Sequence, residues 1–441
     1  MSETRAHGDD AVAVIGAGVA GLSCAVALSR ALPEREIHIF DQGSRGRGGR
    51  TSSSRPSAHD DPLVFDHGCQ FFTASDPEFK AVCASLVRSG HASRWDGRFG
   101  TLDARTGAFA SRDDARGDVP PDDDFFGLLS ADEVFVGVPT MRGLCDGLRA
   151  AAGGHLVIDH PHCAVTDLSL GLAASTPRWT ARGVDHRTLD VGARGDPERH
   201  LGEFRAVVAA DVMLAKTGTP GDCSLRDAPR ESVARRVWND MANAPPDPLF
   251  TLAVAYPIDA FDAAPFSFDA ANITGSPVVR LLVRDGAKPG RRERPDRLER
   301  WVAISSSTFA RDVVAGAPLS VDGKYNPQTA AYLETVTPKM VAEVGRILAL
   351  AAGKGERTAP APAPAHAATH RWGNAFPEGG TVPVAGNGGC YAWDDETGFG
   401  ACGDFVGGAG VEAAWISGTR AGEAAARALT GAPSRGSDGS E

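Results

Sequence analysis

The sequence lacks the features that mark a metal-binding or disulfide-rich protein. Its eight cysteines are scattered, and no two of them stand at CxxC spacing. This pattern predicts reduced thiols and no zinc site, and no HExxH motif is present to suggest another metal centre. We therefore predict no metal.

Positive charge and long apolar runs are also lacking. The formal net charge is −11, which argues against nucleic acid or anionic lipid as a partner. The first ten residues are too few and too acidic for a targeting peptide, and glycines interrupt the apolar run that begins at Ala11. We expect a soluble cytoplasmic protein with no integral membrane segment; another organelle and the oligomeric state stay open.

What the sequence does contain is a dinucleotide-binding unit near its start. AVAVIG (11–16) is typical of a buried parallel strand, an Ala/Leu-rich helix follows, and EIHIFD (36–41) is a second strand. Gly16 permits a tight turn, Gly18 lets the backbone approach a pyrophosphate, and Gly21 allows close helix packing. The N–H groups at the helix start favour phosphate.

Asp41 ends the second strand, twenty residues beyond Gly21. A carboxylate at this distance is placed to accept hydrogen bonds from the ribose hydroxyls, and it disfavours the additional phosphate of NADP. The unit therefore predicts FAD or NAD.

The loop after this strand, SRGRGGRTS (44–52), distinguishes between the two cofactors. Gly48 and Gly49 would let the backbone approach the cofactor, and Arg45 and Arg50 carry charge toward phosphate. The loop resembles the GGR signature of the monoamine-oxidase-like flavoproteins, where it supports the pyrophosphate and ribityl chain of FAD. This resemblance implies an FAD site.

A second signature stands near the C-terminus, in GFGACGDFVGGAGVEAAW (398–415). We expect a strand to end at Gly403 and Asp404 and an alanine-rich helix to begin near Val411. Asp404 is placed to accept a ribityl hydroxyl, and the helix start to face the flavin edge where negative charge gathers. In the same flavoproteins, the position that Val165 matches faces the adenine with its backbone.

Six further stretches resemble renalase and the bacterial renalase-like flavoproteins, in the same order along the chain. FDHGCQFFT (65–73) is similar to the FDHGAQYFT segment of that family, with Cys69 in place of the usual alanine, and STF (307–309) stands where PEW is more usual. The other five stretches are VPTMRGLCDGL (138–148), RDGAKPGR (284–291), RWVAISSSTFAR (300–311), HRWGNA (370–375) and WDDETGFGACGD (393–404).

This resemblance implies an α/β flavoprotein of the p-hydroxybenzoate-hydroxylase type. A Rossmann-type FAD-binding domain would cover 1–75, 130–215 and 365–432. A substrate domain with a mixed or antiparallel sheet and helices would cover 76–129 and 216–364, and 433–441 would be a frayed tail. FAD would be bound without a covalent bond. A small reduced substrate, such as an isomeric dihydronicotinamide dinucleotide, would deliver hydride to flavin N5, with oxygen as the acceptor.

No catalytic residue is predicted, but the resemblance suggests two residues of the pocket. Gln70 would lie near the flavin and Trp372 would wall the substrate cavity; the alternatives are that Gln70 caps backbone and that Trp372 belongs to the core. The predicted cofactor-binding residues are Gly16, Ala17, Gly18, Ala20, Gly21, Asp41, Gln42, Arg45, Gly48, Gly49, Arg50, Gly68, Val165, Gly403, Asp404 and Val411.

Two further residues match reactive positions of amine oxidases but are interpreted otherwise. Cys390, in GGCY, matches the cysteine that carries FAD in monoamine oxidases, yet Asp404 follows it too soon for that arrangement. Lys288 could be taken for an active-site lysine, but KPGR predicts that it caps a turn in a solvent-facing loop. The alternatives to a renalase-like enzyme are a flavin amine oxidase, a flavin-free NAD-dependent dehydrogenase, a carotenoid desaturase-like enzyme and a non-catalytic FAD scaffold.

The middle of the chain shows fewer signals. β-branched runs at 248–257, 277–286 and 300–308 predict antiparallel strands, and apolar spacing predicts a helix over about 327–352. The polar, glycine-containing stretch 101–124 predicts a solvated loop.

Overall fold

The computed structural model divides the chain into two units. Unit 1 comprises Met1–Gly49, Leu148–Pro245 and Pro377–Glu441, and unit 2 comprises Arg50–Gly147 and Pro246–Phe376. The residues that the structure describes are 10–43, 46–54, 63–115, 124–173, 176–185, 198–216, 223–245, 247–261, 266–291, 297–322, 324–353, 362–375 and 389–431.

Unit 1 is built on a six-stranded sheet in the order β10-β2-β1-β14-β24-β23. The first five strands are parallel and β23 is antiparallel to β24. Its strands are β1 (Val12–Ile15), β2 (Ile37–Asp41), β10 (Val157–Pro161), β14 (Ala206–Ala209), β23 (Tyr391–Asp394) and β24 (Phe399–Cys402). The predicted strand–helix–strand unit is confirmed, as is a Rossmann-like parallel sheet whose central strands are almost wholly apolar.

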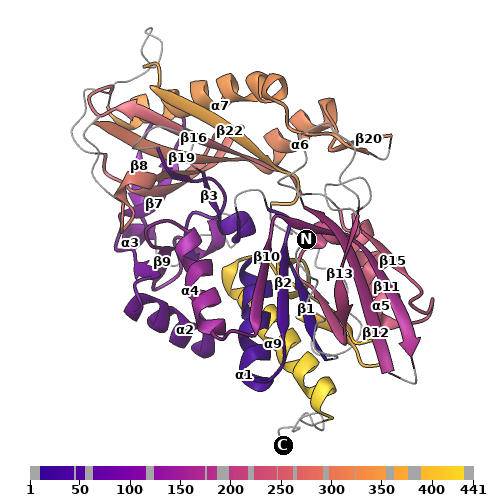
Figure 1. Ribbon diagram of the computed structural model, residues 1–441. Coiled ribbons are helices and arrows are strands. Elements are labelled where there is room, and N and C mark those ends of the chain that lie inside the picture. The colour runs from indigo at the N-terminus through magenta and orange to yellow at the C-terminus, as the bar shows by residue number, and fades with distance from the viewer. Residues whose placement is uncertain are drawn as a thin grey trace, which may run out of the picture. The chain divides into compact units, whose positions relative to one another are not determined.

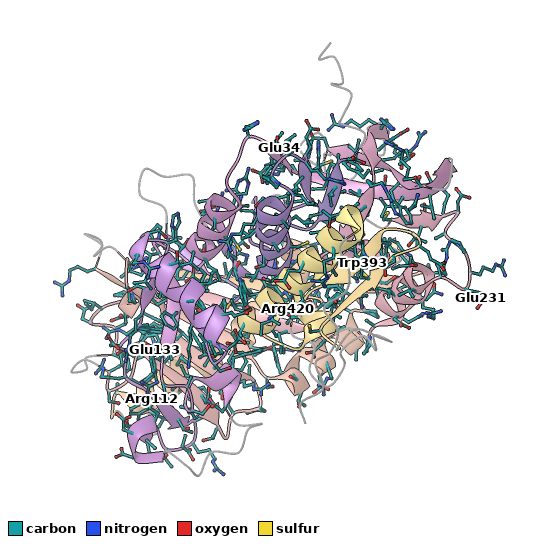
Figure 2. All side chains as sticks on the ribbon, turned by 90° about the horizontal axis from the view of Figure 1, so that it is seen from below. Glu34, Arg112, Glu133, Glu231, Trp393 and Arg420 are labelled. Carbon is teal, nitrogen blue, oxygen red and sulfur yellow. The ribbon has the colours of Figure 1, made fainter. Side chains whose placement is uncertain are left out.

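Two helices from opposite ends of the chain lie side by side against this sheet, α1 (Val19–Ala31) and α9 (Val411–Thr430) (Figure 1). They approach so closely that a Cβ on Gly418 would lie 2.0 Å from the carbonyl oxygen of Ala20. Figure 2 shows Arg420 on α9 and Trp393 on β23, the C-terminal elements of this unit. The predicted alanine-rich helix near Val411 is confirmed, and its small residues are what permit the contact.

A second sheet of unit 1 has the order β13-β12-β11-β15. One apolar core joins it to the first sheet, and the indole of the buried Trp179 donates to the Thr397 carbonyl over 2.7 Å. The remaining elements of this unit are β11 (Cys163–Ala173), β12 (Thr176–Asp185), β13 (Arg199–Phe204), β15 (Ser224–Arg226), η4 (Val212–Ala215), α5 (Val233–Asn243) and α8 (Asp404–Gly407).

Unit 2 is built on a seven-stranded sheet in the order β22-β16-β19-β18-β17-β7-β8. All pairs are antiparallel except β17 with β7, so the predicted antiparallel strands are confirmed. The strands are β7 (Phe99–Asp103), β8 (Phe109–Ser111), β16 (Leu249–Pro257), β17 (Ala270–Thr274), β18 (Val279–Arg284), β19 (Leu298–Ser305) and β22 (His366–Trp372).

The two faces of this sheet are covered differently because side chains alternate along each strand. The Phe250 ring of β16 contacts Phe309 of α6 (Ser307–Gly316) and Tyr332 of α7 (Ala330–Ala351). These helices lie across β16 and β22, and α7 confirms the helix predicted there (Figure 1). The residues on either side of Phe250 therefore point to the opposite face.

The rest of unit 2 consists of short elements. These are β3 (Ser53–Ser54), β4 (Phe65–Asp66), β5 (Phe72–Thr73), β6 (Ala92–Arg94), β9 (Val134–Gly137), β20 (Ser320–Val321), β21 (Lys324–Tyr325), α2 (Pro77–Arg88), α3 (Arg112–Ala115), η1 (Gly49–Thr51), η3 (Phe125–Gly127), η5 (Asp285–Ala287) and α4 (Arg142–Ala152), which contains the boundary at Gly147.

Two expectations differ from the structure. The described part of 101–124 is not simply a loop, because Leu102 and Ala104 are buried where β7 extends the large sheet. The predicted domain boundaries also differ from the packing units: 50–75, 130–147 and 365–376 lie in unit 2, and 216–245 in unit 1. The predicted boundaries follow the cofactor signatures, whereas the units follow the contacts between packed residues. No helix among the described residues has the length and apolarity needed to cross a bilayer.

Gly418→Ala tests the close approach of α1 and α9. Because the added methyl would lie 2.0 Å from the Ala20 carbonyl oxygen, the helices must move apart. We expect the free energy of unfolding, measured with denaturant, to fall by about 1–3 kcal/mol. Gly316→Ala in α6 is the control: outside its own helix, no atom of the described residues lies within 4 Å of its Cβ position, so it should be neutral or stabilising. Equal losses in both variants would contradict the packing argument.

Candidate functional site

In the glycine turn of unit 1, other atoms crowd the Cβ positions of Gly16 and Gly21 but not that of Gly18. Gly16 has φ +113°, and a Cβ on Gly21 would lie 1.9 Å from the Gly16 carbonyl oxygen. Gly18, in contrast, has no atom of the described residues beyond its chain neighbours within 4 Å of its Cβ position, and as the N-cap of α1 it offers no side chain to the helix N–H groups. The turn therefore has open space at the glycine where a phosphate would approach.

Asp41 ties the end of β2 to this turn. One carboxylate oxygen accepts from the Ala17 N–H over 2.9 Å and the other from the Gly43 N–H over 2.7 Å. Burial raises the pKa of Asp41, although these two N–H groups act in the opposite direction. Gly48 also reaches the turn, with its N–H donating to the Ala17 carbonyl over 2.9 Å. Each carboxylate oxygen keeps acceptor capacity, so a ribose contact stays a prediction.

Sequence reasoning missed two acids beside this turn. Asp211, just beyond β14, accepts from the Gln42 amide over 3.0 Å. Asp159 of β10 lies 3.5 Å from the Arg47 guanidinium, which fixes the arginine-rich loop to the sheet. Asp211 could have been found from the sequence, because it follows a buried strand as Asp41 does, and parallel strands place such residues at one sheet edge.

The C-terminal signature is held by a residue that was also missed. The Gly403 N–H donates to the buried Ser417 hydroxyl over 2.8 Å, which ties the end of β24 to α9. Asp404 is buried beside it, and α9 begins at Val411 after an N-cap glycine that offers no side chain. Both long helices at this end of the sheet, α1 and α9, therefore start without a side-chain cap, as does the short α8 that follows Gly403.

The remaining predicted cofactor residues are divided between the units. Ala20 lies in the first turn of α1, and Val165 lies in β11 at a shift in strand register. Arg50 and Gly68 belong to unit 2, with Gly49 at the boundary. Arg45 lies outside the described residues.

Unit 2 contains a small hollow on the sheet face opposite α6 and α7. Leu249 and Thr251 of β16 line it, each directly paired with another lining residue, Trp372 on β22 and Ile304 on β19. The full lining is Arg50, Gly68, Cys69, Leu249, Thr251, Ile304, Trp372 and Ala375. The large sheet therefore provides a mostly apolar floor, and the turn at 66–70 provides part of the wall.

The turn at 66–70 packs directly on Trp372. The Trp372 indole donates to the His67 carbonyl over 2.9 Å, and its ring stacks on the His67 ring at 5.3 Å. A Cβ on Gly68 would lie 2.1 Å from the Arg50 carbonyl oxygen, so only glycine fits there. Burial raises the pKa of the Cys69 thiol to about 12, so it is a neutral lining group. Trp372 thus lines a cavity; a role in substrate binding stays a prediction.

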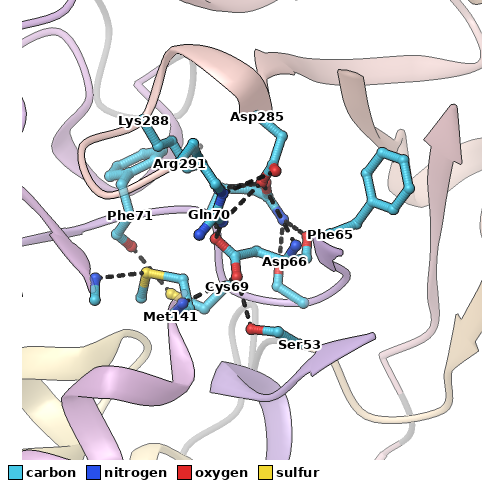
Figure 3. A network of polar contacts seen from close by, with 12 residues as sticks. Ser53, Phe65, Asp66, Cys69, Gln70, Phe71, Met141, Asp285, Lys288 and Arg291 are labelled. Atoms are coloured by element: carbon cyan, nitrogen blue, oxygen red, sulfur yellow. Dashed lines mark hydrogen bonds and ion pairs between the residues drawn. The ribbon is translucent and has the colours of Figure 1, made fainter. Parts of the chain in front are cut away.

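Beside this turn, unit 2 buries a cluster of four ionisable side chains (Figure 3). The Lys288 ammonium lies 2.9 Å from an Asp66 carboxylate oxygen and 3.2 Å from one of Asp285. Arg291 donates to Asp285 over 3.0 Å and also to Asp66. The side chains of Asp66, Asp285 and Lys288 are 0% exposed and that of Arg291 is 3% exposed, so the four charges cancel inside the protein.

The cluster corrects the expectation for Lys288. Its backbone does close a turn, with the N–H donating to the Asp285 carbonyl over 3.3 Å, but its side chain is buried and not solvent-facing. The reason is Asp66, 222 positions earlier in the chain, which local sequence cannot indicate. For Gln70 the backbone-capping alternative holds, since its amide donates to the Asp66 and Gly68 carbonyls over 2.5 and 2.9 Å.

Comparison with known proteins fits this architecture. Residues 14–86 match the model of the NAD(P)-binding Rossmann-like domain. Cyclohexylamine oxidase from Brevibacterium oxydans is similar over 96% of this chain and 100% of its own, with 13% identity and a TM-score of 0.56. An oxidoreductase from Methanosarcina mazei is similar over 93% of this chain and 99% of its own, with 11% identity and a TM-score of 0.58. Putrescine oxidase bound to putrescine is similar over 96% of this chain and 99% of its own, with 13% identity and a TM-score of 0.53. The chain has the fold of these oxidoreductases.

Asp285→Asn tests the buried cluster. Burial by itself raises the pKa of Asp285, but the charges of Arg291 and Lys288 outweigh it and hold the pKa well below its usual range. The ionised form therefore stabilises the fold above the unfolded-state pKa, and this stabilisation is lost as pH falls. At pH 7 we expect the variant to lose roughly 3 kcal/mol of unfolding free energy.

Denaturant titrations across pH measure this effect. The difference between the variant and the unaltered protein should be constant from about pH 6 to 8 and shrink below about pH 4. A difference that widens toward low pH would refute the pairing.

Proposed function

We propose that this protein is an FAD-dependent oxidoreductase of the renalase-like type, with FAD bound non-covalently. The observation that carries the proposal is the open glycine turn of unit 1, where Gly18 caps α1 with no side chain and Asp41 is fixed by the Ala17 N–H at 2.9 Å. FAD, when bound, supplies a two-electron acceptor. The fold shared with oxidases supports the same chemistry.

The residues that would hold the cofactor lie at the turn and at the second helix start. The N–H groups that begin α1 would face the pyrophosphate, and Asp41 would accept from the adenosine ribose. Asp404 and the start of α9 at Val411 would bind the ribityl chain and the flavin edge. Val165 would contribute backbone to the adenine, and the arginine-rich loop would add positive charge.

The proposed substrate is a small, reduced, cyclic molecule such as an isomeric dihydronicotinamide dinucleotide, with oxygen as electron acceptor. Among the described residues that line the hollow of unit 2, none carries a carboxylate, and Arg50 is the cation there. An alkylammonium group would lack a counter-charge at such a lining, whereas a flat uncharged ring could stack on Trp372. Loss of hydride leaves such a substrate aromatic, so orientation matters more than a strong base.

A flavin amine oxidase is the second candidate, because cyclohexylamine oxidase and putrescine oxidase share the fold. A non-catalytic FAD scaffold is the third. These candidates differ in which reductant can reach the flavin.

Gly18→Val tests cofactor binding without a clash inside the protein. In the part of the chain that the structure describes, no atom beyond the chain neighbours lies within 4 Å of the Gly18 Cβ position. The fold should therefore tolerate the side chain, which would fill space proposed for the pyrophosphate. We expect a yellow unaltered protein that releases FAD with acid and a colourless variant that unfolds cooperatively. Gly316→Val, at another open glycine, is the control and should keep its colour. Flavin at full occupancy in Gly18→Val would refute the site.

Anaerobic mixing distinguishes the three functions. Isomeric dihydronicotinamides should bleach the flavin absorbance at least about 100-fold faster than primary amines, because the described lining of the hollow carries no carboxylate to pair with an ammonium ion. Air should then restore the colour. Faster bleaching by amines would support the amine oxidase, and no bleaching by either class would support the scaffold. Colour that stays with denatured protein would overturn non-covalent binding.

A further inference from the structure

Lys288 does more than neutralise the buried carboxylates. Its ammonium also donates to the Gln70 side-chain oxygen over 3.0 Å, in addition to its contacts with Asp66 and Asp285 (Figure 3). An ammonium can only donate, and here it donates to Asp66 and Gln70 while a carboxylate oxygen of Asp285 lies at ion-pair distance. Fully buried among these oxygens, Lys288 is placed to hold other groups in position.

The neighbours of Gln70 dictate which way its amide points. Its nitrogen donates to the Asp66 and Gly68 carbonyls over 2.5 and 2.9 Å, while its oxygen faces Lys288. A carbonyl can only accept and an ammonium can only donate, so the opposite orientation would place donor against donor and acceptor against acceptor. Lys288 therefore fixes the amide, and the amide fixes the turn.

This turn is part of the wall of the hollow. Gly68 and Cys69 line the hollow, and the Cys69 N–H donates to the carbonyl of a third lining residue, Arg50, over 2.7 Å. The Gly68 carbonyl is one of the two that Gln70 binds. A change in the Gln70 amide would thus be transmitted to the lining through one peptide, without any change in the sheet that forms the floor.

Stability alone does not account for such a cluster. A buried ion pair is commonly no more stabilising than apolar residues of the same volume, because desolvation offsets the attraction. In addition, a fully hydrogen-bonded network of charged and polar groups holds its side chains in one conformation. We propose that Lys288 and Gln70 are positioning residues of the hollow: Lys288 orients the Gln70 amide, which holds Gly68 and Cys69 in the lining. An effect of these two residues on turnover rests on the proposed function, whereas their effect on the position of Gly68 and Cys69 does not.

Alkylation of Cys69 measures the lining directly. Gln70→Met keeps the volume and leaves all four charges of the cluster in place, but it removes the bonds to the turn. We expect iodoacetamide to modify Cys69 about tenfold faster in this variant, because the turn opens more often. Peptide mass spectrometry follows each cysteine separately, and the partly exposed Cys390 of unit 1 is the internal reference, with an unchanged rate.

Two further variants separate positioning from general destabilisation. Gln70→Glu can still accept from Lys288 but cannot donate to the two carbonyls, so it should behave like Gln70→Met, and it serves if that variant does not fold. Glu343→Gln removes the charge from an ion pair on α7, away from the hollow, and should leave the Cys69 rate unchanged. Cys69 rates within about twofold of the unaltered protein in both Gln70 variants would overturn the proposal.

Kinetics test the link to turnover. With the best reductant, Gln70→Met should raise the half-saturating concentration for flavin reduction about tenfold while the limiting rate stays within about twofold, because the lining and not the cofactor is altered. Lys288→Arg, which keeps donors toward Gln70, should lie closer to the unaltered protein than Lys288→Met. Unchanged half-saturation despite faster Cys69 alkylation would overturn the link to substrate binding. If the purified protein contained no flavin, the proposed function would be wrong, but the Cys69 alkylation rates would still test the positioning role of Lys288 and Gln70.

Discussion

Two carboxylates that lose all contact with water must meet matching cations, and unit 2 is organised around this constraint. Asp66 lies at the end of β4, whereas Asp285, Lys288 and Arg291 follow β18. Leaving any one of these charges unpaired would cost several kcal/mol, so the two segments must come together for the unit to fold. Asp66 also accepts from the Ser53 hydroxyl over 2.7 Å and from the Met141 N–H over 2.9 Å, so the same carboxylate joins β3 and the start of α4.

The packing of unit 1 depends in a comparable way on close contacts between backbone segments, and not on buried charges. Its glycine turn and its C-terminal helix both need peptide groups to approach where a side chain would collide. Gly21 permits this against Gly16, and Gly418 permits it against Ala20. Because Ala20 lies in the first turn of α1 and Ser417 holds Gly403, the two predicted cofactor signatures belong to one packed layer. Close packing of the two helices therefore also aligns the elements that would bind one ligand.

Local patterns predicted much of this from the sequence. The strand–helix–strand unit, the helix after Gly403 and Asp404 and the antiparallel strands of unit 2 follow from periodicity and glycine spacing, which act over a few residues. The buried contacts of Lys288 with Asp66 and Gln70 did not follow, because these partners stand 222 and 218 positions away from it in the chain. A lysine in KPGR carries the local signal of an exposed turn, and only the tertiary fold reveals the carboxylate that keeps it buried. Likewise, the first residues of the predicted loop 101–124 lie in the sheet, because β7 pairs with the distant strand β17.

The balance of charge in the cluster determines what it can do at the hollow. Two positive and two negative groups at hydrogen-bond distance produce a field that decays quickly, so the cluster adds little net potential to the lining a few ångströms away. Its influence is geometric: it fixes the carbonyls of Asp66 and Gly68 through one amide. The charge at the lining is then that of Arg50, set against the apolar Leu249, Ile304 and Trp372. No acid is among the described residues of this lining, so under the proposed function the hollow would discriminate by shape and ring stacking.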